Sequence, residues 1–156
     1  MTETIREQVL SDIKTTLEGL TIANGYNFDF TPETVQRWSM YGNSAVNLPL
    51  IVITAGDEEE KPLSNNHEEC RLTVYIDAFY VHNEDDQTAT DTYINRLQGD
   101  IKRKILEDET RSGTALNTSI VGSSTFETVD GQAYAGIMIE LLVTYRHKRD
   151  DPAVIV

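Results

Sequence analysis

Apolar positions at helical spacing open the chain. They recur every four residues, and two more widen the stripe: Ile5, Val9, Ile13 and Leu17, with Leu10 and Leu20. This period predicts an amphipathic helix over 5–20 that lays one apolar face on a sheet. Thr2 or Thr4 can cap its start, because a hydroxyl oxygen accepts a hydrogen bond from an unpaired N–H of the first turn.

A second helix is predicted from Thr88 to Glu107. Its apolar positions again share one face: Tyr93, Leu97, Ile101 and Ile105, beside Ile94 and Leu106. Acidic residues come early in this stretch, and Lys and Arg come late, which is the order that the helix dipole favours.

Strict alternation predicts a long strand from Glu69 to Val81. One face carries Cys70, Leu72, Val74, Ile76 and Ala78, and the other carries Arg71, Thr73, Tyr75, Asp77 and Phe79. Both faces hold large side chains, so we expect each to be covered, one by a helix and the other by a loop or a neighbouring subunit.

Shorter strand signals flank this one. Alternating aromatic and polar residues predict a half-buried strand over 26–30, and a second extended piece is expected over 35–41. The apolar run 48–53 predicts a central strand with Pro49 at its entrance. A hairpin is predicted from strands over 119–129 and 133–145, because Asp130-Gly131 is a strong turn signal.

Two polar segments lie outside these elements. Asp57 to Glu69 is expected to be a long acidic loop or the tip of a hairpin. The tail from Arg146 to Val156 crosses charged residues and Pro152 before an apolar end, so it is expected to be an extended C-terminal arm or a disordered end.

The order helix, strands, helix, hairpin predicts an α+β fold. We expect a mostly antiparallel mixed sheet of about six strands with two main helices packed on it. The 156 residues suit a single domain over 1–156, with 146–156 as its arm.

Composition narrows the function. A net charge of −13 disfavours tight nucleic-acid binding, which needs clustered Lys and Arg. The single cysteine, Cys70, excludes an intramolecular disulfide. The N-terminal residues lack the basic and apolar regions of a signal peptide, and no apolar run suits a membrane span, so we expect synthesis and folding in a cytoplasm and no membrane partner.

Motifs for catalysis are not found in the sequence. There is no phosphate-binding glycine loop and no nucleophile elbow, and the three histidines lie far apart. His67 and Cys70 bracket two glutamates, but consecutive strand residues face opposite sides and converge poorly on a metal ion. The acidic runs 57–60 and 84–86 lack the ligand spacing of a calcium loop. We therefore expect no catalytic, cofactor-binding or metal-binding residues, and no enzyme.

The chain resembles the tail terminator proteins of long-tailed bacteriophages, a group that includes related tail-completion and minor tail proteins. The resemblance lies in the order of five segments: the helix 5–20, the strand entry 48–52, the strand 72–79, the helix 93–106 followed by Asp108, and the strand that ends in 143–145. It covers most of the chain as a pattern.

The resemblance implies a structural virion protein that forms a hexameric ring on the last ring of the tail tube. Such a ring ends tube polymerisation and offers a docking surface to the head–tail connector protein, while DNA passes through its hole. The partners would be further copies of the chain, the tube protein and the connector. Acidic residues are candidates for the lumen: Asp57, Glu58, Glu59, Glu60 and Glu68. The candidates for the subunit or tube interface are Trp38, Val154, Ile155 and Val156.

Three other readings stay open. The chain would be a tail tube or connector subunit if it stacked into long polymers or joined the head. It would be a small ligand-binding domain or enzyme if it held a concave pocket with buried titratable groups. A monomer in solution would favour a host regulatory binding module.

Overall fold

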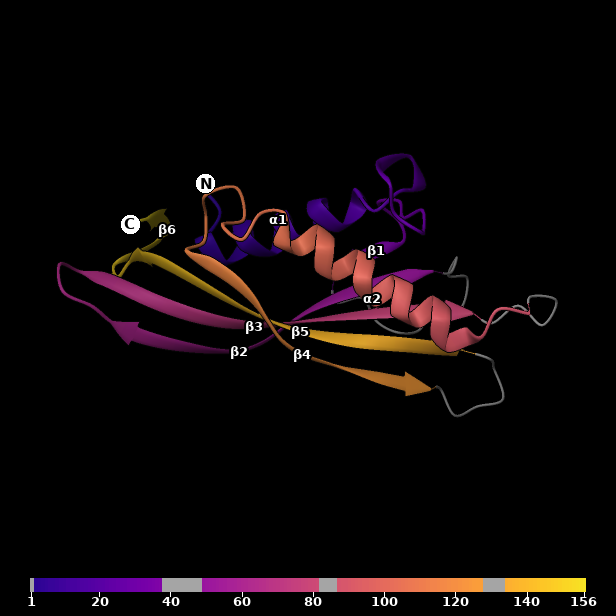
Figure 1. The fold of residues 1–156 in the computed structure, drawn as a ribbon. Coiled ribbons are helices and arrows are strands. Elements are labelled where there is room, and N and C mark those ends of the chain that lie inside the picture. Colours follow the sequence, from indigo (N-terminus) through magenta and orange to yellow (C-terminus); the bar gives the residue numbers. More distant parts are fainter. Residues whose placement is uncertain (1, 38–48, 82–86, 128–133) are drawn as a thin grey trace.

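The computed structural model describes residues 2–37, 49–81, 87–127 and 134–156. Its elements in chain order are α1 (Ile5–Glu18), the short 3₁₀ helix η1 (Ile22–Asn24), β1 (Val35–Arg37), β2 (Leu50–Pro62), β3 (His67–Val81), α2 (Thr90–Leu106), β4 (Asn117–Glu127), β5 (Tyr134–Lys148) and β6 (Asp151–Ile155). Figure 1 shows long, strongly twisted strands with both α-helices on the same side of the sheet.

The sheet is mixed and largely antiparallel. Its strand order is β1-β2-β3-β5-β4, and β6 pairs with β5 off this path. Only β1 and β2 run parallel among the described pairs. Two helices and one such sheet confirm the predicted α+β class.

Helix α1 begins and ends close to its predicted bounds. The Thr4 hydroxyl accepts a hydrogen bond from the backbone N–H of Glu7 at 3.2 Å, so Thr4 is the N-cap. At the other end the Gly19 N–H donates to the carbonyls of Thr16 and Leu17. The apolar stripe is buried as its period predicts: Ile5, Val9, Leu10, Ile13 and Leu17.

Helix α2 and strand β3 supply the other half of the core. The buried face of α2 holds Ile94, Leu97, Ile101 and Ile105, and it also holds Asp100. The predicted face of β3 is fully buried: Cys70, Leu72, Val74, Ile76 and Ala78. These residues join those of α1 and β5 in one apolar cluster, so the two helices and the sheet share a single core.

The strand predicted over 26–30 is wrong. Tyr26, Phe28 and Phe30 are buried, as their alternation suggested. The backbone of this segment pairs with no described strand. The Asn27 N–H donates to the Asp100 carboxylate of α2 at 2.8 Å, and the Phe30 N–H donates to the carbonyl of Leu20, just beyond α1, at 2.8 Å. Every second side chain of this segment is therefore buried although its backbone is not part of the sheet.

The acidic segment after Asp57 is a hairpin and not a long loop. Residues 58–62 of β2 pair with 68–72 of β3, after a bulge between Ala55 and Glu58. Asn65 and Asn66 both have positive φ, 61° and 62°, and asparagine tolerates this conformation in tight hairpin turns. The tip that the sequence offered as an alternative is thus confirmed, with strand on both sides of it.

The C-terminal hairpin is confirmed in its strands, β4 and β5, while its predicted turn at Asp130-Gly131 lies outside the described residues. Strand β5 continues to Lys148, beyond the predicted end at Tyr145. The rest of the tail is not an isolated arm: β6 returns along β5, with His147 opposite Ile155 and Lys148 opposite Asp151.

Candidate functional site

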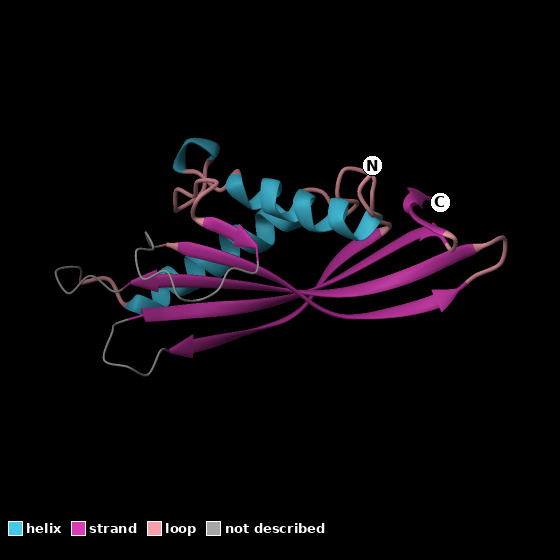
Figure 2. Ribbon diagram, turned by 180° about the vertical axis from the view of Figure 1, so that it is seen from behind, coloured by secondary structure: helices cyan, strands magenta, loops and turns pink. Residues whose placement is uncertain are grey.

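A cavity of about 400 Å³ lies where the β2–β3 hairpin, the start of α1 and β6 meet. Both chain termini lie at this end of the sheet (Figure 2). We call this cavity the end pocket. It is lined by Thr4, Arg6, Glu58, Glu60, Glu68, Tyr145, His147, Arg149 and Pro152.

The strand register explains why polar groups gather here. On the core side of the sheet, Glu60, Cys70 and Tyr145 lie opposite one another across three strands. The next such row holds Pro62, Glu68 and His147. Side chains two residues apart share a face, so the apolar face of β3 and β5 becomes polar in its last two rows.

Tyr145 forms the floor of the end pocket. It is 2% exposed, and its hydroxyl donates a hydrogen bond to the Glu58 carboxylate at 2.6 Å. Burial, and then the hydrogen bond to Glu58, raise the pKa of Tyr145, so the hydroxyl keeps its proton at neutral pH. Arg6 from α1 forms an ion pair with the same carboxylate at 3.2 Å.

Cys70 and two carboxylates meet beside this floor. The Cys70 sulfur and one oxygen each of Glu58 and Glu60 all lie within 4.8 Å of one another. Burial, and then the charge of Glu58, raise the pKa of the Cys70 thiol to about 11. Glu60 is exposed to solvent, and no hydrogen bond or ion pair joins its carboxylate to another described residue.

His147 lines the end pocket and is 9% exposed. Its Nδ1 lies 2.7 Å from the carbonyl oxygen of Lys148. Because a carbonyl oxygen only accepts hydrogen bonds, Nδ1 carries the proton in the neutral ring and Nε2 carries the lone pair. Nε2 forms no hydrogen bond with any described residue. The side chain therefore offers a nitrogen ligand or an acceptor to whatever enters the pocket.

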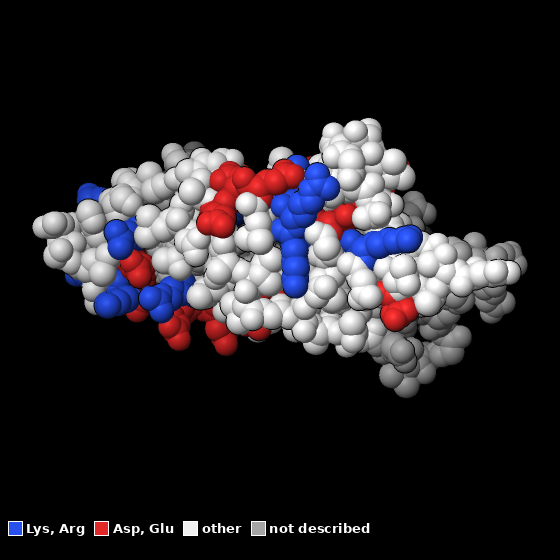
Figure 3. Space-filling view, in the orientation of Figure 1, with Lys and Arg blue, Asp and Glu red and all other residues white. Residues whose placement is uncertain are grey.

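Ion pairs lie on both faces of the sheet at this end. Arg149 binds the Glu68 carboxylate at 3.2 Å and donates to the Leu63 carbonyl at 3.0 Å, while Arg146 binds Glu69 at 2.8 Å. Figure 3 shows blue and red side chains close together at this end of the molecule. These pairs fasten the turn of the β2–β3 hairpin to the end of β5.

The predicted site residues separate into three groups. Glu58, Glu60 and Glu68 of the expected lumen group line the end pocket, whereas Asp57 and Glu59 are exposed and do not. The expected interface residues on and beside β6 are exposed: Val154 at 42%, Ile155 at 48% and Val156 at 38%. Trp38 lies outside the described residues.

Sequence reasoning missed Tyr145 and His147. It ended a predicted strand at Tyr145 and placed His147 in the tail that follows. Neither has a local signal for a site, because the pocket arises from the pairing of β3 with β5, far apart along the chain.

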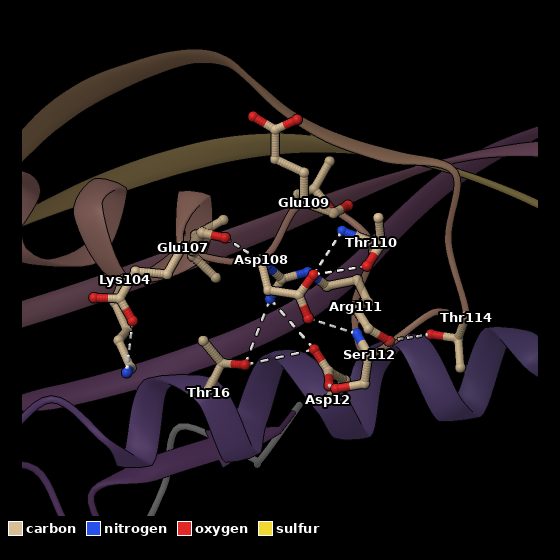
Figure 4. A network of polar contacts seen from close by, with 12 residues as sticks. Asp12, Thr16, Lys104, Glu107, Asp108, Glu109, Thr110, Arg111, Ser112 and Thr114 are labelled. Carbon is tan, nitrogen blue, oxygen red and sulfur yellow. Dashed lines mark hydrogen bonds and ion pairs between the residues drawn. The ribbon is translucent and has the colours of Figure 1, made fainter.

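A second group of buried polar side chains lies between α1 and the connection from α2 to β4. We call Asp12, Thr16, Asp108, Arg111 and Ser112 the Arg111 network (Figure 4). Arg111 is fully buried. Its guanidinium binds the Asp12 carboxylate at 3.3 Å and donates to the Ile105 carbonyl.

The backbone of this connection is held in an unusual conformation. Arg111 and Ser112 have φ of 49° and 56°, in the left-handed region that disfavours residues other than glycine. Asp108 accepts hydrogen bonds from the N–H groups of Ser112 at 2.7 Å and Thr110 at 3.0 Å, and Ser112 Oγ donates to Asp12 at 2.8 Å. The network joins the connection to α1, which is a structural role.

Comparisons with known proteins give no family for the chain. No family model matches it, and no curated protein matches it. None of the described helices is long and apolar enough to cross a membrane. The chain's own surfaces and pocket therefore carry what can be inferred about its function.

Proposed function

We propose that the chain is a structural subunit of a viral tail. It assembles with five further copies of itself into a hexameric ring at the head-proximal end of the tail tube. The ring ends tube polymerisation and presents a surface to the head–tail connector protein. In this proposal the two helices form a layer packed on one face of the sheet, so that the strand edges remain for assembly.

The observation that carries the proposal is the strand order at the end of the sheet. There the local order is β2-β3-β5-β6, because β1 pairs only with 51–53 of β2 and β4 pairs with β5 no further than Thr144. Among the described strands, 54–62 of β2 pair only with β3, and β6 pairs only with β5. The same sheet end thus offers two unpaired edges on opposite sides.

Two such edges suit head-to-tail assembly. A ring uses different surfaces of each subunit, one meeting the other on the next copy, until the rotation closes. Strand β6 of one subunit can add to the outer edge of β2 in the next, since an open edge is a template for a further strand. Each subunit added in this way still has one unpaired strand edge, so a further subunit can bind until the ring closes.

Charged side chains lie at both edges. The β2 edge carries the exposed acidic residues Asp57 and Glu59. The residues around the start of β6 carry charges of both signs: Lys148 and Arg149, both 46% exposed, and the exposed Asp150 and Asp151. The apolar side chains of 154–156 are exposed in the single chain, and burial against a neighbour would stabilise them. Acidic side chains outside the contact between subunits would line the central hole of the ring, where they would not bind the passing DNA. The net charge of −13 agrees with this arrangement.

The absolute mass of the purified chain tests the ring. We expect light scattering over a range of concentrations to give a discrete species of about six subunits. Deletion of Ala153–Val156 should return the mass to that of a monomer. Ile155→Asp should do the same, because it sets a carboxylate against the acidic edge of β2.

Ile22→Asp is the matched control. Ile22 is 60% exposed but lies in η1, away from both edges, so this variant should keep the assembled mass. A wild-type chain that is a monomer at every concentration contradicts the ring. Long polymers instead of one discrete species would indicate a tail tube subunit.

A second function has one specific observation in its favour. The end pocket has the volume of a small-ligand site and contains the buried groups Tyr145 and His147. A monomeric wild-type chain would therefore favour a ligand-binding domain over a ring subunit.

A further inference from the structure

We propose that the end pocket, together with the buried Cys70 thiol beside Glu58 and Glu60, is a site for a divalent transition-metal ion of the zinc class, with Glu58, Glu60, Cys70 and His147 as its ligands. The site does not depend on ring assembly, because all four side chains belong to one chain. It would hold the β2–β3 hairpin against β5.

Three ligand atoms already lie together. The Cys70 sulfur and one carboxylate oxygen each of Glu58 and Glu60 are within 4.8 Å of one another. Zinc bonds of about 2.0 to 2.3 Å place neighbouring ligand atoms roughly 3.5 Å apart in a tetrahedron. The group thus needs to contract by about 1 Å, a shift that side-chain rotation can supply.

His147 provides the independent sign of a ligand. It is buried to more than nine-tenths, it lines the pocket, and its Nδ1 donates to a backbone carbonyl at 2.7 Å. Metal-binding histidines commonly have this arrangement, since the hydrogen bond fixes the ring and leaves the other nitrogen for the metal. His147 is the diagonal neighbour of Cys70 across β3 and β5, but its ring nitrogens do not lie within 4.8 Å of all three other ligand atoms. Metal binding therefore requires the His147 ring to turn toward them.

The charge of the pocket favours a cation. Glu58 and Glu60 lie near each other and near Cys70, and no ion pair joins Glu60 to another described residue. The competing charge is Arg6, which pairs with Glu58 at 3.2 Å, and a metal ion would have to displace its 40% exposed side chain. Arg149 is engaged by Glu68 and the Leu63 carbonyl.

The donor set selects the kind of metal. Magnesium and calcium prefer oxygen ligands alone, whereas one thiolate, one imidazole and two carboxylates suit zinc. Binding would release the Cys70 proton, because the thiolate is the ligand.

Titration of the full chain with Zn²⁺, after treatment with a chelator, tests the site. We expect one Zn²⁺ per chain, no comparable uptake of Mg²⁺, and a rise in the melting temperature with Zn²⁺. Co²⁺ in place of Zn²⁺ should give a thiolate-to-metal charge-transfer absorption in the near ultraviolet, which Cys70→Ser abolishes. Glu60→Gln and His147→Gln should each weaken Zn²⁺ binding by about tenfold or more.

Glu59→Gln is the matched control, since Glu59 is exposed on the same strand but does not line the pocket. Glu60 is itself exposed, so Glu60→Gln tests the ligand without disturbing the core. Equal Zn²⁺ affinity in the Glu59 and Glu60 variants would overturn the proposal. So would a Co²⁺ complex without the charge-transfer band, which would show adventitious binding to surface carboxylates.

Discussion

The Arg111 network and the end pocket both place charged groups among buried side chains, but they complete their contacts differently. In the network the Arg111 guanidinium, the Asp12 and Asp108 carboxylates and the Ser112 hydroxyl bind one another or the backbone. In the end pocket Tyr145 and Arg6 bind Glu58, while Glu60 and His147 line the cavity, and neither the Glu60 carboxylate nor Nε2 of His147 has a partner among the described residues.

The difference separates stability from binding. A buried polar group costs free energy unless its hydrogen bonds are made, so a network whose carboxylates and hydroxyls bind one another or the backbone is part of the folded structure. Groups that remain unpaired around a cavity are available to a ligand. Arg111 Nε is the one buried side-chain nitrogen or oxygen of the described residues without a partner, and Arg111 does not line the end pocket.

Removal of Arg111 should have the largest effect on stability. Arg111→Ala leaves Asp12 without its buried cation and the Ile105 carbonyl without its donor. Breaking a buried pair from one side commonly costs about 3 to 5 kcal/mol, and Asp12 is 18% exposed, so we expect a loss of roughly 2 to 4 kcal/mol. Urea unfolding followed by circular dichroism measures it.

Arg37→Ala is the matched control, because Arg37 also pairs with a carboxylate of α1, that of Glu7. Both partners of that pair are about one-third exposed, at 31% and 38%, so its loss should cost no more than about 1 kcal/mol. Equal losses in the two variants would remove the distinction between a buried network and a surface ion pair.

Cys70 should be unreactive in the native, metal-free chain. Its ordinary pKa of 9.0 is raised to about 11, so fewer thiolates exist at any pH below 9 and alkylation slows with them. At pH 8 the two-unit shift alone predicts a rate about a hundredfold below that of the unfolded chain. The native rate should still rise above pH 9, where the rate of the unfolded chain levels off. A native rate that levels off near pH 9 would contradict the raised pKa.

Much of the fold follows from local pattern. The stripe of α1, the alternation of β3 and the two strands of the C-terminal hairpin were predicted from spacing alone, because each buries one continuous face. The prediction over 26–30 failed since aromatic alternation reports burial and not backbone pairing. The sequence left the acidic segment as either a long loop or the tip of a hairpin. Tyr145 and Arg146, which bind the carboxylates of this hairpin, lie far along the chain and give no local signal.

The end pocket could not be predicted for a related reason. The sequence correctly places Cys70 on an apolar face. The metal site considered from sequence joined His67 to Cys70 along one strand, and it was rejected because these two residues point to opposite faces. The pocket instead brings together Glu60 of β2, Glu68 of β3 and His147 of β5, with Cys70 beside it. Strand register at long range decides which residues meet, and no local spacing gives it.

Glu60→Gln should have the smallest effect on stability, and it is the most direct test of the difference between the Arg111 network and the end pocket. In the metal-free chain Glu60 has no described partner and lies close to the like charge of Glu58, so removing its charge loses no contact and relieves repulsion. We expect the free energy of unfolding to stay within about 0.5 kcal/mol of the wild type, or to rise slightly. Urea unfolding in the presence of a chelator measures this. A loss above about 1 kcal/mol would mean that Glu60 is part of a closed structural network, like that of Arg111, and is not held ready for a ligand.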